Sequence, residues 1–371
     1  MGPLLAAKRL RTNKARSPHS PARRGFSLVE LLVVLLVSVF VVGAALTIYQ
    51  VNVRYYIQQD SLLEQTQNLR VAMYTVARDV RMAGNCFTLM GTGVKRIQAY
   101  IPAIGDQPAG WFRYSSGGDY GALPVFGLDG GTGGTDSLTI FRADIESASP
   151  VGQLANAYTP GGSSVRLDFI EPFGKGTLED GDIVALVNDD RAMLLEAGGI
   201  DSLNRAYATI GGRFRPDSGK GFPGGDYTFP RGTYVYNLRD ITLVTYQVDG
   251  DLKALVANYH DGGLMGDNID KDNMVIVANN IEDFQVRYWI STGAALTVTP
   301  LEGDDSISEG QLADGGNWIK AVNLAMSAIS PTVDQKRGLN SPQPLFNHSS
   351  VGPPDRHLRR SLAETVYLRN F

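Results

Sequence analysis

One carboxylate stands inside the most apolar part of the chain. Residues 26–48 carry a single charged side chain, Glu30, and a basic segment precedes them. An unpaired carboxylate in hydrocarbon is costly, so a partner is expected. Cutting the Gly25–Phe26 bond would create such a partner, because Phe26 would then carry a free α-amine. We predict that Glu30 of one chain pairs with the Phe26 amine of a neighbour; a glutamate that only reaches the membrane surface is the alternative.

The apolar run has the length of a membrane span. As a helix, residues 26–48 would cover roughly 34 Å, enough for a bilayer core. Residues 1–25 carry seven Lys and Arg and no Asp or Glu, and the positive-inside rule keeps such a segment in the cytoplasm. A secretory signal peptide is cut after its apolar stretch, whereas Gly25 stands before it. We therefore predict a leader (1–25), a helix in the inner-membrane lipid (26–48) and a periplasmic remainder.

The order Gly25-Phe26-Ser27-Leu28-Val29-Glu30-Leu31 resembles the processing motif of type IV pilins and type II secretion pseudopilins. The resemblance implies that a prepilin peptidase cleaves after Gly25 and N-methylates Phe26, and that Glu30 is the assembly glutamate. Many major pilins have a helix-breaking proline in this span, but no proline occurs between Phe26 and Gly84. We therefore expect a continuous helix in which Gly43 is the one weak point.

Helical patterning continues beyond the membrane. One face repeats at 4-3-4-3-4 spacing and consists of Leu62, Thr66, Leu69, Met73, Val76 and Val80. The opposite face is expected to carry Gln65, Asn68, Arg70, Arg78 and Arg81. Gly84-Asn85 is a helix stop signal, so one helix is predicted from Phe26 to Ala83. Its amphipathic part, residues 49–84, is predicted to pack on its own head; a coiled-coil dimer is the alternative.

The rest of the chain predicts a β-rich head, residues 85–371. Short apolar runs alternate there with segments rich in Gly, Pro and Asp, which favours antiparallel sheets. Asp249-Gly250 predicts a hairpin and Asn237–Asp240 a turn between two strands. The predicted strands are 137–143, 165–169, 182–187, 234–238, 241–249, 252–258, 284–291 and 319–330. The expected fold is α+β, with a long N-terminal helix packed on antiparallel sheets.

Four further segments resemble PilW-type minor pilins. They are residues 68–70 with 78–84, residues 281–288, residues 322–330, and residues 358–360 with 365–370. The resemblance implies a structural subunit that primes or takes part in type IV pilus assembly. It also implies other minor pilins, a major pilin, the assembly platform and a tip adhesin as partners. A J-type minor pseudopilin of a type II secretion system is the alternative with the same N-terminus.

Catalytic patterns are missing from the sequence. Cys86 is the single cysteine, so no intrachain disulfide and no C-x-x-C site can form. No G-x-S-x-G, H-E-x-x-H or P-loop occurs, and we predict neither an enzyme nor a cofactor. The chain beyond the basic leader is acidic, which argues against nucleic acid as a partner. A tip-borne adhesion module and a membrane-anchored periplasmic protein remain alternatives.

One acidic segment has oxygen ligands of the kind that Ca²⁺ prefers. They would come from Asp267, Asn268, Asp270 and Asp272. An EF-hand loop would require glycine after the third ligand, where Asn273 stands, and glutamate at the twelfth position, where Asn279 stands. We interpret the segment as a solvated acidic turn, with calcium binding as the alternative.

Overall fold

The computed structural model contains one helix, α1, and strands β1 to β17 in the part of the chain that it describes. That part comprises residues 26–85, 97–101, 110–111, 124–128, 130, 134–145, 150–162, 165–169, 178–189, 191–198, 207–208, 227–259, 274–291, 298–300, 318–331, 345–346 and 355–368. The chain divides into two compact units, Met1–Gln59 and Asp60–Phe371. Helix α1 contributes residues to both units. The predicted boundaries at 48/49 and 84/85 stay predictions.

Helix α1 runs from Leu28 to Met82 without interruption at Gly43. The predicted long helix is therefore confirmed, with ends one or two residues inside the expected ones. Gly84 follows with a φ of 67°, a left-handed conformation that glycine adopts without a steric penalty. Its amide donates to the Phe141 carbonyl at 3.0 Å, so the helix stop also connects to a strand.

The larger sheet has eleven strands, and its main path runs β1-β9-β8-β11-β12-β13. These strands are Ile97–Gln98 (β1), Arg191–Gly198 (β9), Ile183–Asn188 (β8), Tyr234–Asp249 (β11), Ala254–Tyr259 (β12) and Met274–Asn279 (β13). Off this path lie β4 (Val125–Leu128), β5 (Ser137–Ile145), β6 (Gly152–Leu154), β7 (Leu167–Phe169) and β10 (Tyr207–Ala208). All pairs are antiparallel except β1 with β9. The hairpin predicted at Asp249-Gly250 is confirmed, because Asp249 pairs with Ala254.

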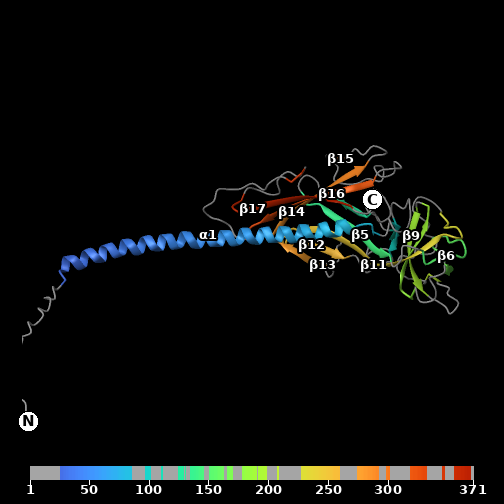
Figure 1. Cartoon of the computed structure of the whole chain (residues 1–371), viewed down its shortest axis with the longest axis horizontal. Helices are drawn as coiled ribbons and strands as arrows, with labels where there is room; N and C mark the ends of the chain where they lie inside the picture. The colour runs from blue at the N-terminus through green and yellow to red at the C-terminus, as the bar shows by residue number, and fades with distance from the viewer. Residues whose placement is uncertain are drawn as a thin grey trace, which may run out of the picture. The chain divides into compact units, whose positions relative to one another are not determined.

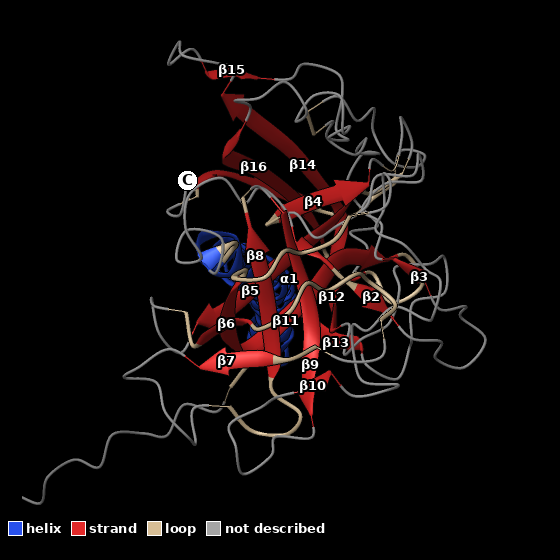
Figure 2. Cartoon of the chain, turned by 90° about the vertical axis from the view of Figure 1, so that its right-hand side faces the viewer, coloured by secondary structure: helices blue, strands red, loops and turns tan. Residues whose placement is uncertain are grey.

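A second sheet has the antiparallel order β15-β14-β16-β17. Its strands are Ile281–Ser291 (β14), Val298–Pro300 (β15), Trp318–Ile329 (β16) and Arg359–Tyr367 (β17). A short ribbon joins β2 (Tyr100–Ile101) and β3 (Gly110–Trp111). In Figure 2, strands of both large sheets lie around α1. The long helix and its antiparallel sheets confirm the predicted α+β class.

The prediction of a turn at Asn237–Asp240 is wrong. Strand β11 is continuous through these residues, and its first part pairs with β8 while a later part pairs with β5. The pairing register shifts between Arg239 and Thr242. A β-bulge of this kind bends a strand and leaves one or more residues outside the hydrogen-bonded pairing, but the strand continues. The sequence pattern of a turn therefore marks an irregularity within one strand.

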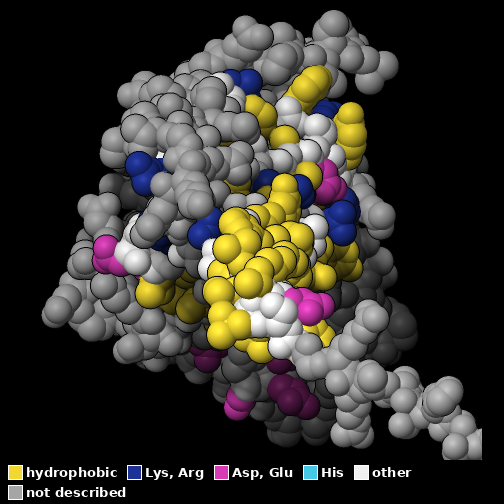
Figure 3. Space-filling model, turned by 90° about the vertical axis from the view of Figure 1, so that its left-hand side faces the viewer, with side chains coloured by type: hydrophobic (Ala, Val, Ile, Leu, Met, Phe, Trp, Pro, Cys, Tyr) yellow, Lys and Arg dark blue, Asp and Glu magenta, His cyan; other side chains and the backbone are white. Residues whose placement is uncertain are grey.

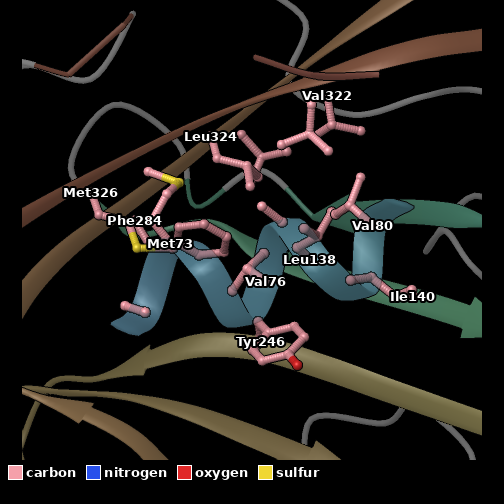
Figure 4. Packing of buried hydrophobic residues seen from close by; sticks show 14 of the residues in the cluster. Met73, Val76, Val80, Leu138, Ile140, Tyr246, Phe284, Val322, Leu324 and Met326 are labelled. Carbon is pink, nitrogen blue, oxygen red and sulfur yellow. The ribbon is translucent and has the colours of Figure 1, made fainter. Parts of the chain in front are cut away.

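The main core forms where the second half of α1 meets both sheets (Figures 1 and 4). Met73, Val76 and Val80 of α1 are buried there. They share one hydrophobic cluster with Leu138, Ile140, Tyr246, Phe284, Val322, Leu324 and Met326. Each fully buried apolar side chain of this size contributes about 1.5–3 kcal/mol. This packing confirms the predicted stripe at four positions, Leu69, Met73, Val76 and Val80; Leu62 and Thr66 are half-buried.

Gln65 was expected on the solvent side of α1, but it is fully buried. It lies four residues before Leu69, so helical geometry puts the two side chains on the same face. The Gln65 amide nitrogen donates to the Leu358 carbonyl at 3.3 Å. A second core, which includes Tyr158, Leu186, Met193 and Phe229, lies among β6, β8, β9 and β11.

Candidate functional site

The described chain begins at Phe26, two residues before α1. The Leu31 amide donates to the Ser27 carbonyl at 3.1 Å, so Ser27 accepts the first intrahelical bond and is the N-cap residue. Phe26 therefore precedes the hydrogen-bonded helix, and its side chain is 76% exposed. Gly25 and the rest of the predicted leader lie outside the described residues. The backbone next to the predicted cleavage point is thus not part of a helical turn.

Glu30 lies in the first turn of α1, and its side chain is exposed. Ser27 and Glu30 have the Ser-x-x-Glu spacing of a capping box, and a carboxylate near a helix N-terminus interacts favourably with the helix dipole. The position of Glu30 therefore suits the start of a helix, which sequence reasoning missed although the Ser-x-x-Glu spacing is a signal for it. Within the described part of the chain, no ion pair involves Glu30.

The N-terminal part of α1 is apolar on every side. Its most apolar 18-residue window has a mean hydropathy of 3.0, and none of that window is buried. Figure 3 shows hydrophobic side chains gathered on the part of α1 nearest the viewer. A helix that is apolar all round requires lipid or other helices as its surroundings. Among the described residues, α1 is the one helix long and apolar enough to cross a membrane.

A buried carboxylate lies near the other end of α1. The Asp79 side chain has no exposed surface and accepts a 2.7 Å hydrogen bond from the Tyr246 hydroxyl of β11. Arg78 Nε donates to the same carboxylate at 3.0 Å, and Arg142 Nη1 of β5 lies 3.5 Å from it. Burial and the Asp79 charge raise the pKa of Tyr246, and the bond to Asp79 raises the pKa of Arg78. These four residues, the Asp79 cluster, join α1 to two strands.

Strand β17 is bonded to α1 at two points. Arg360 Nη1 donates to Thr66 Oγ1 at 2.8 Å, and Arg81 Nη2 donates to Glu364 Oε1 at 2.8 Å. These contacts connect the C-terminal part of the chain to the N-terminal helix.

Arg359 joins the start of β17 to its neighbours in the sheet. It is nearly buried and donates to Asp355 through Nη1 at 2.6 Å and through Nη2 at 2.7 Å. Its Nε donates to Glu282 Oε1 of β14 at 2.8 Å. Bidentate pairs of this kind are the stronger class of ionic hydrogen bond. The hydrogen bonds from Arg359 lower the pKa of Asp355 to about 2.

The segments that carry the minor-pilin resemblance come together in the fold. The end of α1, β14, β16 and β17 contribute Val80, Phe284, Val322 and Val366 to one core cluster. Arg359 and Glu282, which belong to two of these segments, form an ion pair. Each segment thus contributes to the packing of the fold.

The acidic segment, the cysteine and the histidines form no reactive site within the described part of the chain. The acidic residues 267–272, Cys86, His260 and His348 lie outside the described residues. His357 Nδ1 lies 2.7 Å from the Ser330 carbonyl, beside the start of β17. In the described part of the chain, no group of three or more His, Cys, Asp or Glu side chains is placed to hold a metal ion. Calcium binding therefore stays an untested alternative.

Comparison with known proteins gives one match, and it coincides with the processing segment. Residues 20–46 match the prokaryotic N-terminal methylation motif. No curated protein and no solved structure matches the chain. The matched residues include Gly25, Phe26 and Glu30, together with most of the apolar run. The chain therefore carries the leader motif of type IV pilin-like proteins.

Proposed function

We propose that this protein is a minor pilin of the PilW type. It is cleaved between Gly25 and Phe26, N-methylated on Phe26, and incorporated into a type IV pilus from the inner membrane. The observation that carries the proposal is the methylation motif at residues 20–46, which coincides with an exposed Glu30 in the first turn of a membrane-length helix. A prepilin peptidase is the first partner that this chemistry requires.

Glu30 is proposed to select the position of the subunit in the assembly. Cleavage leaves an α-ammonium on Phe26, four residues before the carboxylate in the sequence. Within hydrocarbon each charge is stabilised only by a partner, and a neighbouring subunit supplies the opposite one. Pairing Glu30 with a neighbour's Phe26 amine therefore favours one lateral arrangement of the helices over others.

The head is proposed to act as a structural and contact-making domain without catalysis. The described polar contacts of Asp79, Arg359 and Arg360 bond α1, β5, β11, β14 and β17 to one another. A head of this size is accommodated best at a fibre end, where no subunit stacks above it. Other minor pilins, a major pilin, the assembly platform and a tip adhesin are the proposed partners.

The first experiment is the intact mass and N-terminal sequence of the membrane-extracted protein, from cells with and without prepilin peptidase. A chain that starts at N-methyl-Phe26 only when the peptidase is present supports the proposal. A chain that keeps residues 1–25, or is cut after the apolar run, contradicts it.

A J-type pseudopilin of a type II secretion system would carry the same N-terminal motif. A deletion strain separates the two candidates, because loss of surface pili with normal secretion supports the minor pilin. Loss of secretion with normal pili supports the pseudopilin. Retained pili with lost adhesion would instead favour a tip-borne binding module.

A further inference from the structure

Strand β13 forms one edge of the larger sheet, because within the described structure it pairs with β12 alone. Most of the other described strands that pair on one side only have two to four residues, namely β1, β2, β3, β4, β7, β10 and β15. Such short edges offer little backbone to a further strand. The two longer edges are β13, with six residues, and β17, with nine. These two edges are therefore the candidates for pairing with another chain.

The two long edges differ in charge. Strand β17 includes Arg359, Arg360 and Glu364, and the last two bond to α1. Charged side chains on an edge strand oppose pairing with another chain. Strand β13, with the sequence MVIVAN, contains neither a charged side chain nor a proline. Among such protective features, the described residues of β13 have only a register shift against β12.

Apolar side chains are exposed on both faces of β13. Val275 and Ile276 are 53% and 51% exposed, although the residues opposite them in β12, Ala257 and Val256, are buried. Consecutive residues of a strand point to opposite faces of a sheet. Each face of the sheet therefore ends in a half-exposed β-branched side chain. A strand added beside β13 would cover both side chains and continue the sheet.

The direction of β13 disfavours a second copy of the chain as the partner. Val275 lies level with Tyr246, which bonds to Asp79, because both pair with the same residue of β12. Asn280, directly after β13, donates to Glu64 at 3.1 Å, so β13 runs opposite to α1. Anchoring in one membrane gives two copies the same direction, a step that rests on the proposed function. Their β13 edges would then run parallel, whereas identical edges pair symmetrically when they are antiparallel.

We propose that β13 binds an extended segment of a different protein, which joins the larger sheet as a further strand. The backbone N–H and C=O groups along the edge recognise such a segment through main-chain hydrogen bonds. The segment is uncharged over six residues, the length of β13, because a charge beside Val275 or Ile276 would lose water without gaining an ion pair. Its β-branched or aromatic side chains pack against these two residues.

Photo-cross-linking at single positions tests the proposal with the full chain, in cells that assemble it. The photoreactive residue p-benzoylphenylalanine replaces Val275, Ile276 or Asn279, and mass spectrometry locates each attachment point. We expect all three variants to capture one protein at one short segment. The attachment point should move along that segment in step with the position in β13, as neighbouring strands require. The same replacement of Leu362, which is exposed on the charged edge β17, is the matched control and should give about a tenth of the yield.

A lysine on the edge tests the same pairing independently. Ile276→Lys should lower the cross-linking yield at Val275 about tenfold, since pairing would place a charge among apolar side chains. Leu252→Lys is the matched control, because Leu252 is similarly exposed but belongs to the β11–β12 hairpin. This control should leave the yield unchanged.

Four results would overturn the inference in a chain whose leader is correctly processed. They are attachment points scattered over several surfaces, an equal yield from the Leu362 control, capture of a second copy alone, and no captured protein. An unprocessed leader would instead refute the proposed function. Leader processing is read as a size difference on the same gel, so the two failures are distinguishable.

Discussion

Removing one hydroxyl group measures how firmly α1 is attached to the head. Tyr246→Phe deletes the donor that lies 2.7 Å from Asp79 Oδ2, and both side chains are fully buried, so water cannot replace it. The aromatic ring stays in the core, and no cavity larger than one oxygen atom forms. A hydrogen bond to a charged group contributes about 1.5–3 kcal/mol. We expect the free energy of unfolding to fall by about 2 kcal/mol.

Asp79→Asn should cost more than Tyr246→Phe. The amide has nearly the size of the carboxylate, but the charge that both Arg78 and Arg142 face is lost. Breaking a buried ion pair costs about 3–5 kcal/mol, and we expect about 3 kcal/mol because both arginines keep contact with water. The double variant should be less destabilised than the sum of the two single variants, since they share one hydrogen bond.

The assay is urea unfolding of the detergent-solubilised full-length chain, followed by circular dichroism. Tyr234→Phe is the matched control, because Tyr234 lies on the same strand, β11, with its side chain about half exposed. A surface change of this kind shifts stability by less than about 0.5 kcal/mol. If Tyr246→Phe unfolds at the same urea concentration as Tyr234→Phe, the hydrogen bond does not stabilise the fold and the reasoning is wrong.

Three further predictions concern other parts of the chain. Glu30→Ala should leave leader cleavage intact, as measured by N-terminal mass, but reduce the protein in sheared pili; normal incorporation would contradict the pairing with Phe26. The Arg359 bonds lower the pKa of Asp355 in the folded chain from 3.8 to about 2. Their contribution to the free energy of unfolding is therefore complete above about pH 4 and is lost as the pH falls to about 2. Asp355→Asn should remove that acid-dependent contribution from the urea-unfolding free energy, about 1 kcal/mol because a third of the carboxylate is exposed. Gly127→Ala places a Cβ 2.3 Å from a carbonyl oxygen of β5 and should lower the thermal midpoint through a loss of about 1–3 kcal/mol, whereas Gly250→Ala meets no atom within 4 Å and should leave the midpoint unchanged.

Local signals in the sequence predicted the helix and one hairpin well. The absence of proline, the apolar stripe and Gly84 together define α1 to within one or two residues at either end. The Asp249-Gly250 pair likewise defines the turn between β11 and β12. In each case the determining interaction is made within a few residues of the signal. The error at Gln65 came from assigning it by polarity when its position four residues before Leu69 already placed it on the buried face.

Interactions between distant residues could not be predicted in the same way. Asp79 and Tyr246 are 167 positions apart, and Arg359 and Glu282 are 77 apart. A sequence read alone shows only a charged residue in a helix and an arginine near the C-terminus. The turn predicted within β11 failed for a related reason, because pairing with β8 and then with β5 keeps the strand extended across Asn237–Asp240.

The two ends of α1 therefore differ: the processing motif at the N-terminal end is visible in the sequence, whereas the contacts of Asp79 near the C-terminal end are not. The roles proposed for Gly25, Phe26 and Glu30 depend on a free amine, a carboxylate and lipid. None of these requires a folded head. Any force applied to Glu30 during assembly must nevertheless pass along α1 to the strands, and the Asp79 cluster is one connection that can carry it. Tyr246→Phe should thus leave leader processing unchanged while making the head on assembled fibres easier to unfold, which protease sensitivity under shear measures. Equal loss of processing and protease resistance would mean that the variant acts on folding before assembly begins.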